Sequence, residues 1–338
     1  MLIQPQTREE FYNRYHTEKT QLQAKVSLKA FEDYLLDHDM IEQELFTSLK
    51  KDDDQRYLFL DNLVQYWHST NKSANTIHNY FSFVRAWLWI NGVKTNQYEI
   101  KFVVIFPKTI REVRKPLTYE IIRNMLNRCD AKYKALYLIL ASSGMRIGEV
   151  LALRKQDLEY KNNPIRVHVR AETTKTKQER QTYISQEAFE VLRPIIQEKK
   201  DDELIFDMKY VTVANQISKL RQRCGYLEKY SNGKNYYVNI HALRAFFHTQ
   251  ATLKHGVETA HALLGHGTYL NQYFRLTEEN RDKMYKELEP LVSIYVSDRT
   301  RVKIEQMKKQ VEDMDLMKKK FAVIEAKLAR IELTKKEI

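Results

Sequence analysis

The sequence has only two cysteines in 338 residues and no long apolar run. Cys129 and Cys224 lie far apart, and the absence of a Cys-x-x-Cys motif argues against a disulfide scaffold or a thiolate metal site. Apolar runs such as residues 135–141 are far too short to span a bilayer, and the first ten residues lack the features of a secretion signal. We therefore expect a protein of the reducing cytoplasm without a membrane anchor.

Acidic residues are outnumbered by basic ones. Lysine and arginine total 56 against 44 aspartates and glutamates, which gives a formal charge of +12 and a pI near 9.3. This surplus favours polyanionic partners, nucleic acid first, although a basic protein without such a partner fits the same numbers equally well. The chain is also longer than one hydrophobic core usually supports, so we expect more than one domain.

The first part of the chain, residues 1–105, is predicted to be a small helical domain. Apolar side chains between residues 20 and 98 recur at steps of three and four, which is typical of helices with one buried face. Ser73 is suited to begin the third of these helices, and Asn91-Gly92 to end it.

A basic segment bracketed by two prolines follows at residues 106–117. Proline and the residue before it resist helix formation, so the pattern predicts an extended linker between domains. Its cations could follow a DNA phosphate backbone or could simply be solvated; they are Lys108, Arg111, Arg114 and Lys115.

Residues 118–295 are predicted to form a second domain, mainly helical with one small sheet. Period-two alternation at residues 164–170 and 180–184 indicates a two-stranded ribbon, with residues 172–177 near its turn. The last segment, 296–338, repeats apolar residues at steps of three and four with one register slip, which predicts a C-terminal amphipathic helix in a coiled coil or docked on a partner. The predicted fold class is therefore mainly α, of the α+β type.

Several polar motifs are candidates for chemistry. Arg146 directly follows a glycine-containing break in an apolar helical run, where its rigid fork and a helix N-terminus would suit phosphate oxygens. His241 and Arg244 are three residues apart and share one helical face. Each motif is weak by itself; the others are Lys175 at the ribbon turn, Leu-Gly-His266, and the downstream tyrosines Tyr269 and Tyr273.

Taken in order, these motifs resemble the tyrosine recombinase, or phage integrase, family. The resemblance rests on Gly-Met-Arg146-Ile-Gly-Glu149-Val-Leu-Ala-Leu, the ribbon lysine, His241-x-x-Arg244, Leu-Gly-His266 and a following tyrosine. It extends over residues 118–290, and the helical module at about 20–98 is similar to the family's core-binding domain, which binds DNA. The resemblance implies a site-specific DNA recombinase.

The resemblance also implies a role for each residue. Cleavage by a tyrosine needs an in-line phenol, stabilisation of charge on the phosphate, and a proton for the leaving oxygen. The implied catalytic set is a clamp (Arg146, Arg244), a hydrogen-bonding partner of the phosphate or acceptor of the phenol's proton (His241), a donor to a non-bridging oxygen (His266), a general acid (Lys175), a nucleophile (Tyr273) and an orienting carboxylate (Glu149). A covalent 3′-phosphotyrosyl intermediate would form without ATP, a cofactor or a metal. The guanidinium groups would stabilise the charge on the phosphate in place of a metal cation.

Two assignments stay open in the sequence. Lys175 is preferred over Lys177 because counting back from Glu179-Arg180 places it at the family's position. Tyr273 follows His266 by seven residues, two fewer than is usual in the family, and Tyr269 by three, so Tyr273 is the preferred nucleophile and Tyr269 the alternative. Three further histidines lack the close pairing of zinc helices and are expected to be packing or surface residues: His248, His255 and His261.

The implied partners are double-stranded DNA and further copies of this chain, as a dimer on each site and a tetramer at synapsis. The C-terminal helix favours integration or excision of a viral or plasmid genome over resolution of chromosome dimers by a Xer-like enzyme. A non-catalytic DNA-binding regulator on the same scaffold is the alternative from another class. A metal-dependent nuclease is disfavoured, because the carboxylate groups at 52–54 and 201–203 resemble solvated turns.

Overall fold

The computed structural model describes residues 7–109, 112–230, 235–265 and 276–295, together with the single positions 314, 317 and 321. The chain divides into two compact units, residues 1–111 and 112–338. This boundary lies inside the basic segment 106–117, whose described residues belong to no helix or strand.

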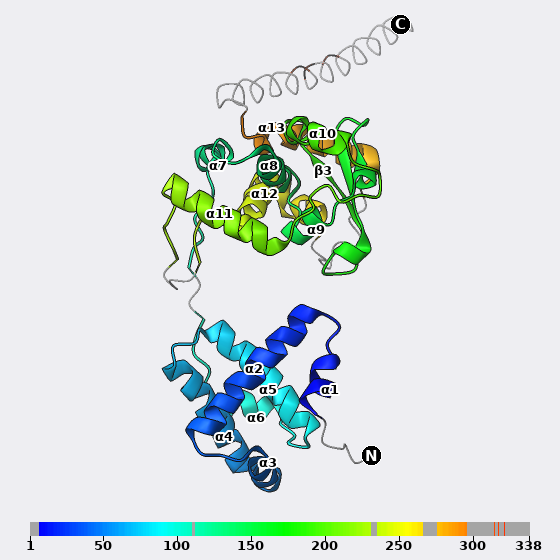
Figure 1. Cartoon of the computed structure of the whole chain (residues 1–338). Coiled ribbons are helices and arrows are strands. Elements are labelled where there is room, and N and C mark those ends of the chain that lie inside the picture. Colours follow the sequence, from blue (N-terminus) through cyan, green and yellow to red (C-terminus); the bar gives the residue numbers. More distant parts are fainter. Residues whose placement is uncertain are drawn as a thin grey trace, which may run out of the picture. The chain divides into compact units, whose positions relative to one another are not determined.

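The described residues of the first unit form helices only (Figure 1). Helices α2 and α4 pack against α5 around buried side chains such as Phe31, Leu60 and Trp67. The predicted ends of the third helix are confirmed: the Ser73 hydroxyl accepts a hydrogen bond from the Thr76 amide at 3.3 Å, and α5 stops just before Asn91-Gly92. The helices are α1 (Arg8–Asn13), α2 (Glu18–Asp37), α3 (Glu42–Lys51), α4 (Asp53–Ser69), α5 (Ala74–Ile90) and α6 (Gln97–Val103).

The second unit combines helices with one small sheet. Its helices are α7 (Tyr119–Leu126), α8 (Ala131–Ser143), α9 (Ile147–Leu151), α10 (Gln186–Gln197), α11 (Tyr210–Cys224), α12 (Ile240–Leu264) and α13 (Glu278–Val292), with short 3-10 turns η1 (Lys155–Asp157) and η2 (Ala171–Thr173). Helix α8 lies in the middle, against α10, α12 and α13 (Figure 1). Its residues 135–143 are all buried, as expected for a helix covered on every side.

The sheet is antiparallel and has the strand order β1-β2-β3. Strands β2 (Ile165–Val169) and β3 (Arg180–Ile184) pair with Ile165 opposite Ile184, which confirms the predicted ribbon. A third strand, β1 (Leu158–Glu159), was not predicted, because two residues are too short to show an alternating pattern. The confirmed fold class is thus mainly helical with a small sheet.

Some predictions fall outside the described residues: those for Arg111, His266, Tyr269 and Tyr273, and most of the C-terminal amphipathic segment. In that segment Met314, Met317 and Phe321 are helical and exposed. Within the described ranges, no helix is both long enough and apolar enough to cross a membrane.

Candidate active site

The helical run breaks before Arg146 at the point where α8 comes into close contact with α12. Helix α8 ends at Ser143, and Gly144 has a positive φ of 63°. A Cβ atom on Gly144 would lie 2.3 Å from the Phe247 ring and 2.5 Å from the Leu264 side chain, both on α12. Only glycine fits this backbone and this space, so the apolar run is interrupted where α8 meets α12.

Arg146 lies one residue before α9, as its N-cap, rather than in its first turn. The Glu149 carboxylate accepts the Arg146 backbone N–H at 2.8 Å and its Nη1 at 3.0 Å. Glu149 is buried, whereas the Arg146 side chain remains 30% exposed. The predicted orienting role of Glu149 has this geometry as its support: one carboxylate binds both the backbone and the side chain of Arg146.

Arg180, at the start of β3, binds the same carboxylate. Its Nη1 and Nη2 donate to the two oxygens of Glu149 at 3.2 and 2.6 Å. Burial would raise the pKa of Glu149, but the hydrogen bonds and charges of Arg180 and Arg146 outweigh burial and lower it. In the sequence, Glu179-Arg180 served only to locate the ribbon lysine, and this contact was not predicted, because no spacing rule links two residues that lie 31 positions apart in the chain.

Arg244, on the first turns of α12, is buried, and its guanidinium donates to the carbonyl oxygens of Gly144 and Leu264. Its pKa is lowered to about 10, chiefly by burial and also by the positive charges of Arg146 and Arg180, while the negative charge of Glu149 opposes the decrease. Among the described residues, the guanidinium groups of Arg146 and Arg180 thus bind the Glu149 carboxylate, and that of Arg244 lies close enough to be influenced by the same negative charge. This surplus of fixed positive charge at a helix junction is suited to an anion.

His241 is exposed at the start of α12, one turn before Arg244. Its pKa is lowered, first by the protein atoms that replace water around part of the ring, and then by the charges of Arg244, Arg114 and Arg146. A lowered pKa keeps this imidazole neutral at pH 7, the state in which it can accept a proton. The structure therefore brings Arg146, His241 and Arg244 together.

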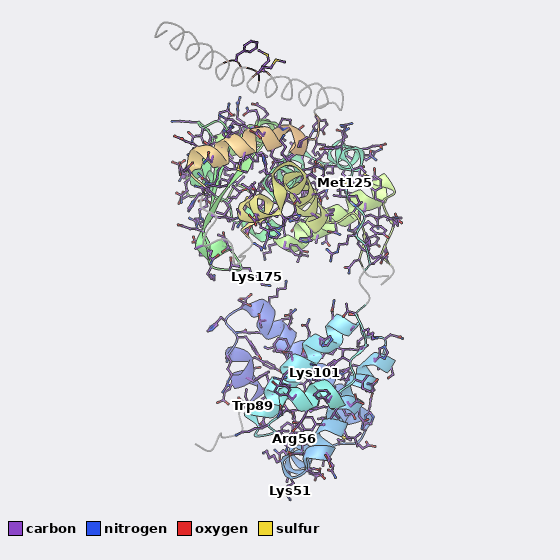
Figure 2. All side chains as sticks on the ribbon, turned by 180° about the vertical axis from the view of Figure 1, so that it is seen from behind. Lys51, Arg56, Trp89, Lys101, Met125 and Lys175 are labelled. Carbon is purple, nitrogen blue, oxygen red and sulfur yellow. The ribbon has the colours of Figure 1, made fainter. Side chains whose placement is uncertain are left out.

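The two lysines of the ribbon turn differ in their surroundings. Lys177 has a φ of 55°, and its Nζ donates to the Glu172 carbonyl at 3.3 Å. Lys175 is exposed at the edge of its unit (Figure 2) and makes no hydrogen bond or ion pair with any described residue. The absence of such a contact to the described residues favours Lys175 over Lys177 as the proposed general acid, although among those residues no hydrogen bond joins Lys175 to the guanidinium cluster.

Gly265, directly after α12, immediately precedes the candidate residue His266 in the chain. Gly265 follows the helix with a φ of 65°, and a Cβ there would lie 2.5 Å from Cδ of Arg180. His266 is the next residue. Arg180 consequently touches both the carboxylate that orients Arg146 and the backbone from which His266 and Tyr273 continue.

The other histidines have structural contacts. The rings of His248 and His261 lie 5.4 Å apart, and His255 bonds to the Met284 carbonyl at 2.8 Å. In the part of the chain that is described, no three His, Cys, Asp or Glu side chains gather in a way that could hold a metal.

Comparison with known proteins agrees with this arrangement. Residues 115–280 match the model of the phage integrase family. The chain is 31% identical over 195 residues to the tyrosine recombinase XerA of Saccharolobus solfataricus, covering 56% of this chain and 59% of that protein. It is 27% identical over 259 residues to the tyrosine recombinase XerC of Chlamydia caviae, covering 69% and 76%.

The aligned region spans less than two thirds of the XerA relative. Among solved structures, a lambda integrase dimer bound to a COC′ core site shares the fold, with a TM-score of 0.56 and 14% identity over 83% of this chain and 74% of that one. Residues 115–280 of this chain therefore form a domain of the phage integrase family, and the relatives that the chain matches are named tyrosine recombinases.

Proposed function

We propose that this protein is a site-specific DNA recombinase that cuts and rejoins DNA through a covalent 3′-phosphotyrosyl intermediate. The observation that carries the proposal is the guanidinium cluster of Arg146, Arg180 and Arg244 around the single carboxylate of Glu149. Arg146 keeps part of its side chain exposed, so it can bind a phosphate that approaches from solvent.

In the proposed reaction, the phenol oxygen of Tyr273 attacks the phosphorus and loses its proton to His241. The bond from phosphorus to the 5′-oxygen breaks, and Lys175 donates a proton to that oxygen. Arg146, Arg244 and His266 stabilise the charge on the non-bridging oxygens. The reverse attack, by a 5′-hydroxyl of the partner strand, releases the tyrosine and rejoins DNA, so the reaction consumes no ATP and requires no divalent cation.

The proposed partners are double-stranded DNA with specific attachment sites and further copies of this chain. A dimer on each site and a tetramer at synapsis would align four strands for exchange. The basic charge of the chain supports the DNA partner, as does the solved lambda integrase dimer on its core site. We further propose that the reaction integrates and excises a viral or plasmid genome.

A covalent-trapping assay tests the chemistry. The protein is incubated in EDTA with nicked DNA that carries the sequence flanking its own gene, and SDS-resistant adducts are mapped by peptide mass spectrometry. A phosphotyrosyl peptide at Tyr273 that is lost in Tyr273→Phe supports the mechanism, and one at Tyr269 moves the nucleophile to the alternative position. Binding without any adduct would point to a non-catalytic DNA-binding regulator.

The biological direction needs a different assay. A supercoiled plasmid with one attachment site is mixed with a linear fragment that carries the other, and products are separated by size. Intermolecular joining supports integration. Recombination confined to two directly repeated sites on one molecule would instead identify a Xer-like resolvase.

A further inference from the structure

Two short segments between α11 and α12, residues 228–230 and 235–237, pair in antiparallel fashion and bring two tyrosine rings together. Lys229 pairs with Tyr236 in a single β-bridge, the Tyr230 amide donates to the Asn235 carbonyl at 2.8 Å, and the Tyr237 amide donates to the Glu228 carbonyl at 3.1 Å. The rings of Tyr230 and Tyr237 lie 4.1 Å apart. We call Tyr230 and Tyr237, with Glu228 beside them, the tyrosine clamp.

The tyrosine clamp holds the start of the second unit. The Tyr237 hydroxyl donates to the Glu112 carboxylate at 3.3 Å. Lys115 lies with its Nζ 4.6 Å from the centre of the Tyr237 ring and 2.5 Å from the Glu228 carboxylate. Glu112 and Lys115, on either side of Arg114, are therefore both in contact with these paired segments, and the charge of Lys115 is paired with that of Glu228 at the surface.

Arg114 itself is exposed and makes no hydrogen bond or ion pair with any residue that the structure describes. Its side chain lines a cavity of about 190 Å³ together with His241, Tyr230, Thr249 and Gln250. The polar part of the wall contains two cations, of which Lys115 is paired with Glu228, together with an imidazole, a phenol, a hydroxyl and two amides. The rest of the wall is apolar, and none of the residues that line it is a carboxylate. Such a lining suits an oxyanion.

We propose that Arg114 is a further phosphate-binding residue, held beside His241 by the tyrosine clamp, and that it binds the DNA phosphate next to the one at Arg146 and Arg244. The proposal rests on the proposed function for the identity of its ligand. Arg114 and His241 line the same cavity, and the positive charge of Arg114 contributes to the lowered pKa of His241.

The tyrosine clamp explains how the exposed Arg114 side chain could bind a phosphate at one defined position. A free arginine on an extended segment would lose much side-chain and backbone freedom on binding a phosphate. The contacts of Glu112 and Lys115 restrict the backbone around Arg114 before DNA arrives and so reduce that loss. Arg114 then contributes a charge-assisted bond at one position of the DNA backbone rather than a diffuse attraction along it.

A titration with inorganic phosphate tests the site without DNA or cleavage. The full-length protein is labelled in its histidine rings, and the His241 signals are followed by NMR as phosphate is added at constant pH and ionic strength. We expect a saturable shift whose dissociation constant rises about tenfold in Arg114→Gln, the effect of losing one charge-assisted bond. Arg193→Gln removes the same charge from α10, where Arg193 is paired with Glu190, and should leave the constant unchanged.

A second variant separates position from charge. Tyr237→Ala removes no charge but deletes the hydrogen bond to Glu112 and the ring contact of Lys115, while the ion pair between Lys115 and Glu228 remains. It should also weaken phosphate binding, by roughly threefold or more if the clamp fixes Arg114. Arg114 is exposed, so Arg114→Gln keeps the fold and decides the matter even if Tyr237→Ala unfolds. Wild-type affinity in Arg114→Gln, or a His241 signal that does not respond to phosphate in the wild type, overturns the proposal.

The DNA ligand is tested in the trapping assay. At saturating DNA, Arg114→Gln should form the tyrosyl adduct about tenfold more slowly than Arg193→Gln. If the wild type forms no adduct, the proposed function fails, while the phosphate titration still reports on the Arg114 site. Equal adduct rates in the two variants would reject the role of Arg114 in the reaction.

Discussion

Arg180 on β3 binds both oxygens of the Glu149 carboxylate, 31 residues away in the chain, while its Cδ packs on Gly265 at the end of α12. The same carboxylate holds Arg146. Arg180 therefore connects strand β3 with Arg146, a proposed phosphate-binding residue, and with the start of the segment that contains His266. Arg180 thereby acts as a positioning residue for the proposed site.

Removing the Glu149 charge should destabilise the protein strongly. Glu149→Gln leaves Arg180 and Arg244 buried without their shared negative charge, so the free energy of unfolding should fall by about 3 kcal/mol or more. Urea unfolding measures the change, with the exposed Glu120→Gln as control. In the double variant Glu149→Gln, Arg180→Met, part of the loss should return because one uncompensated charge is removed. Strictly additive losses would contradict a direct interaction.

The contribution of Glu149 should depend on pH. Its pKa is lower in the folded protein than the value of about 4.3 that is usual for a free glutamate, so folding favours the ionised form. The stabilisation is then fully present above pH 4.3 and is lost as the pH falls through the folded pKa. In urea unfolding from pH 6 to pH 3, the stability gap between the wild type and Glu149→Gln should narrow on acidification. A gap independent of pH would show that the carboxylate does not titrate as a paired group.

Substitutions at two glycines of the second unit distinguish the cost of backbone strain from the cost of steric crowding. Gly144 and Gly225 both have positive φ, 63° and 74°, but only at Gly144 would a Cβ collide with neighbouring atoms. Gly225→Ala should cost about 1 kcal/mol from strain, and Gly144→Ala roughly 2–5 kcal/mol, because overpacking against Phe247 and Leu264 is added. Thermal or urea unfolding compares them. Similar losses at the two sites would mean that α8 and α12 can move apart at little cost.

Lys175 and Lys177 can be distinguished by changing the leaving atom of the DNA substrate. Lys175→Ala should slow single-turnover cleavage by about 10²- to 10⁴-fold, since the 5′-oxygen leaves poorly without a proton. Lys177→Ala should have little effect, as Lys177 is bonded to the Glu172 carbonyl. A substrate with sulfur in place of the 5′-oxygen needs no protonation and should restore the rate of Lys175→Ala. Absence of that rescue would exclude Lys175 as the general acid.

Local features were predictable because they depend on residues close in the chain. Ser73 caps α5 through a neighbour three residues away, and β2 and β3 follow from alternation within five residues each. The bond between Arg146 and Glu149 also spans three residues and is set by the helix start. A pattern of side-chain types contains this information directly.

The remaining parts required tertiary structure because their partners are distant in the chain. No spacing rule links Gly144 to Phe247, Glu149 to Arg180 or Glu112 to Tyr237, and each contact exists only after α8, α12 and the sheet have packed. The sequence by itself determined the helical class and the ribbon, and it proposed Arg146, His241 and Arg244 as the core of the site. Packing alone decided that Arg180 shares the carboxylate of Glu149 with Arg146, that Lys177 and not Lys175 has a hydrogen bond among the described residues, and that Arg114 and His241 line one cavity.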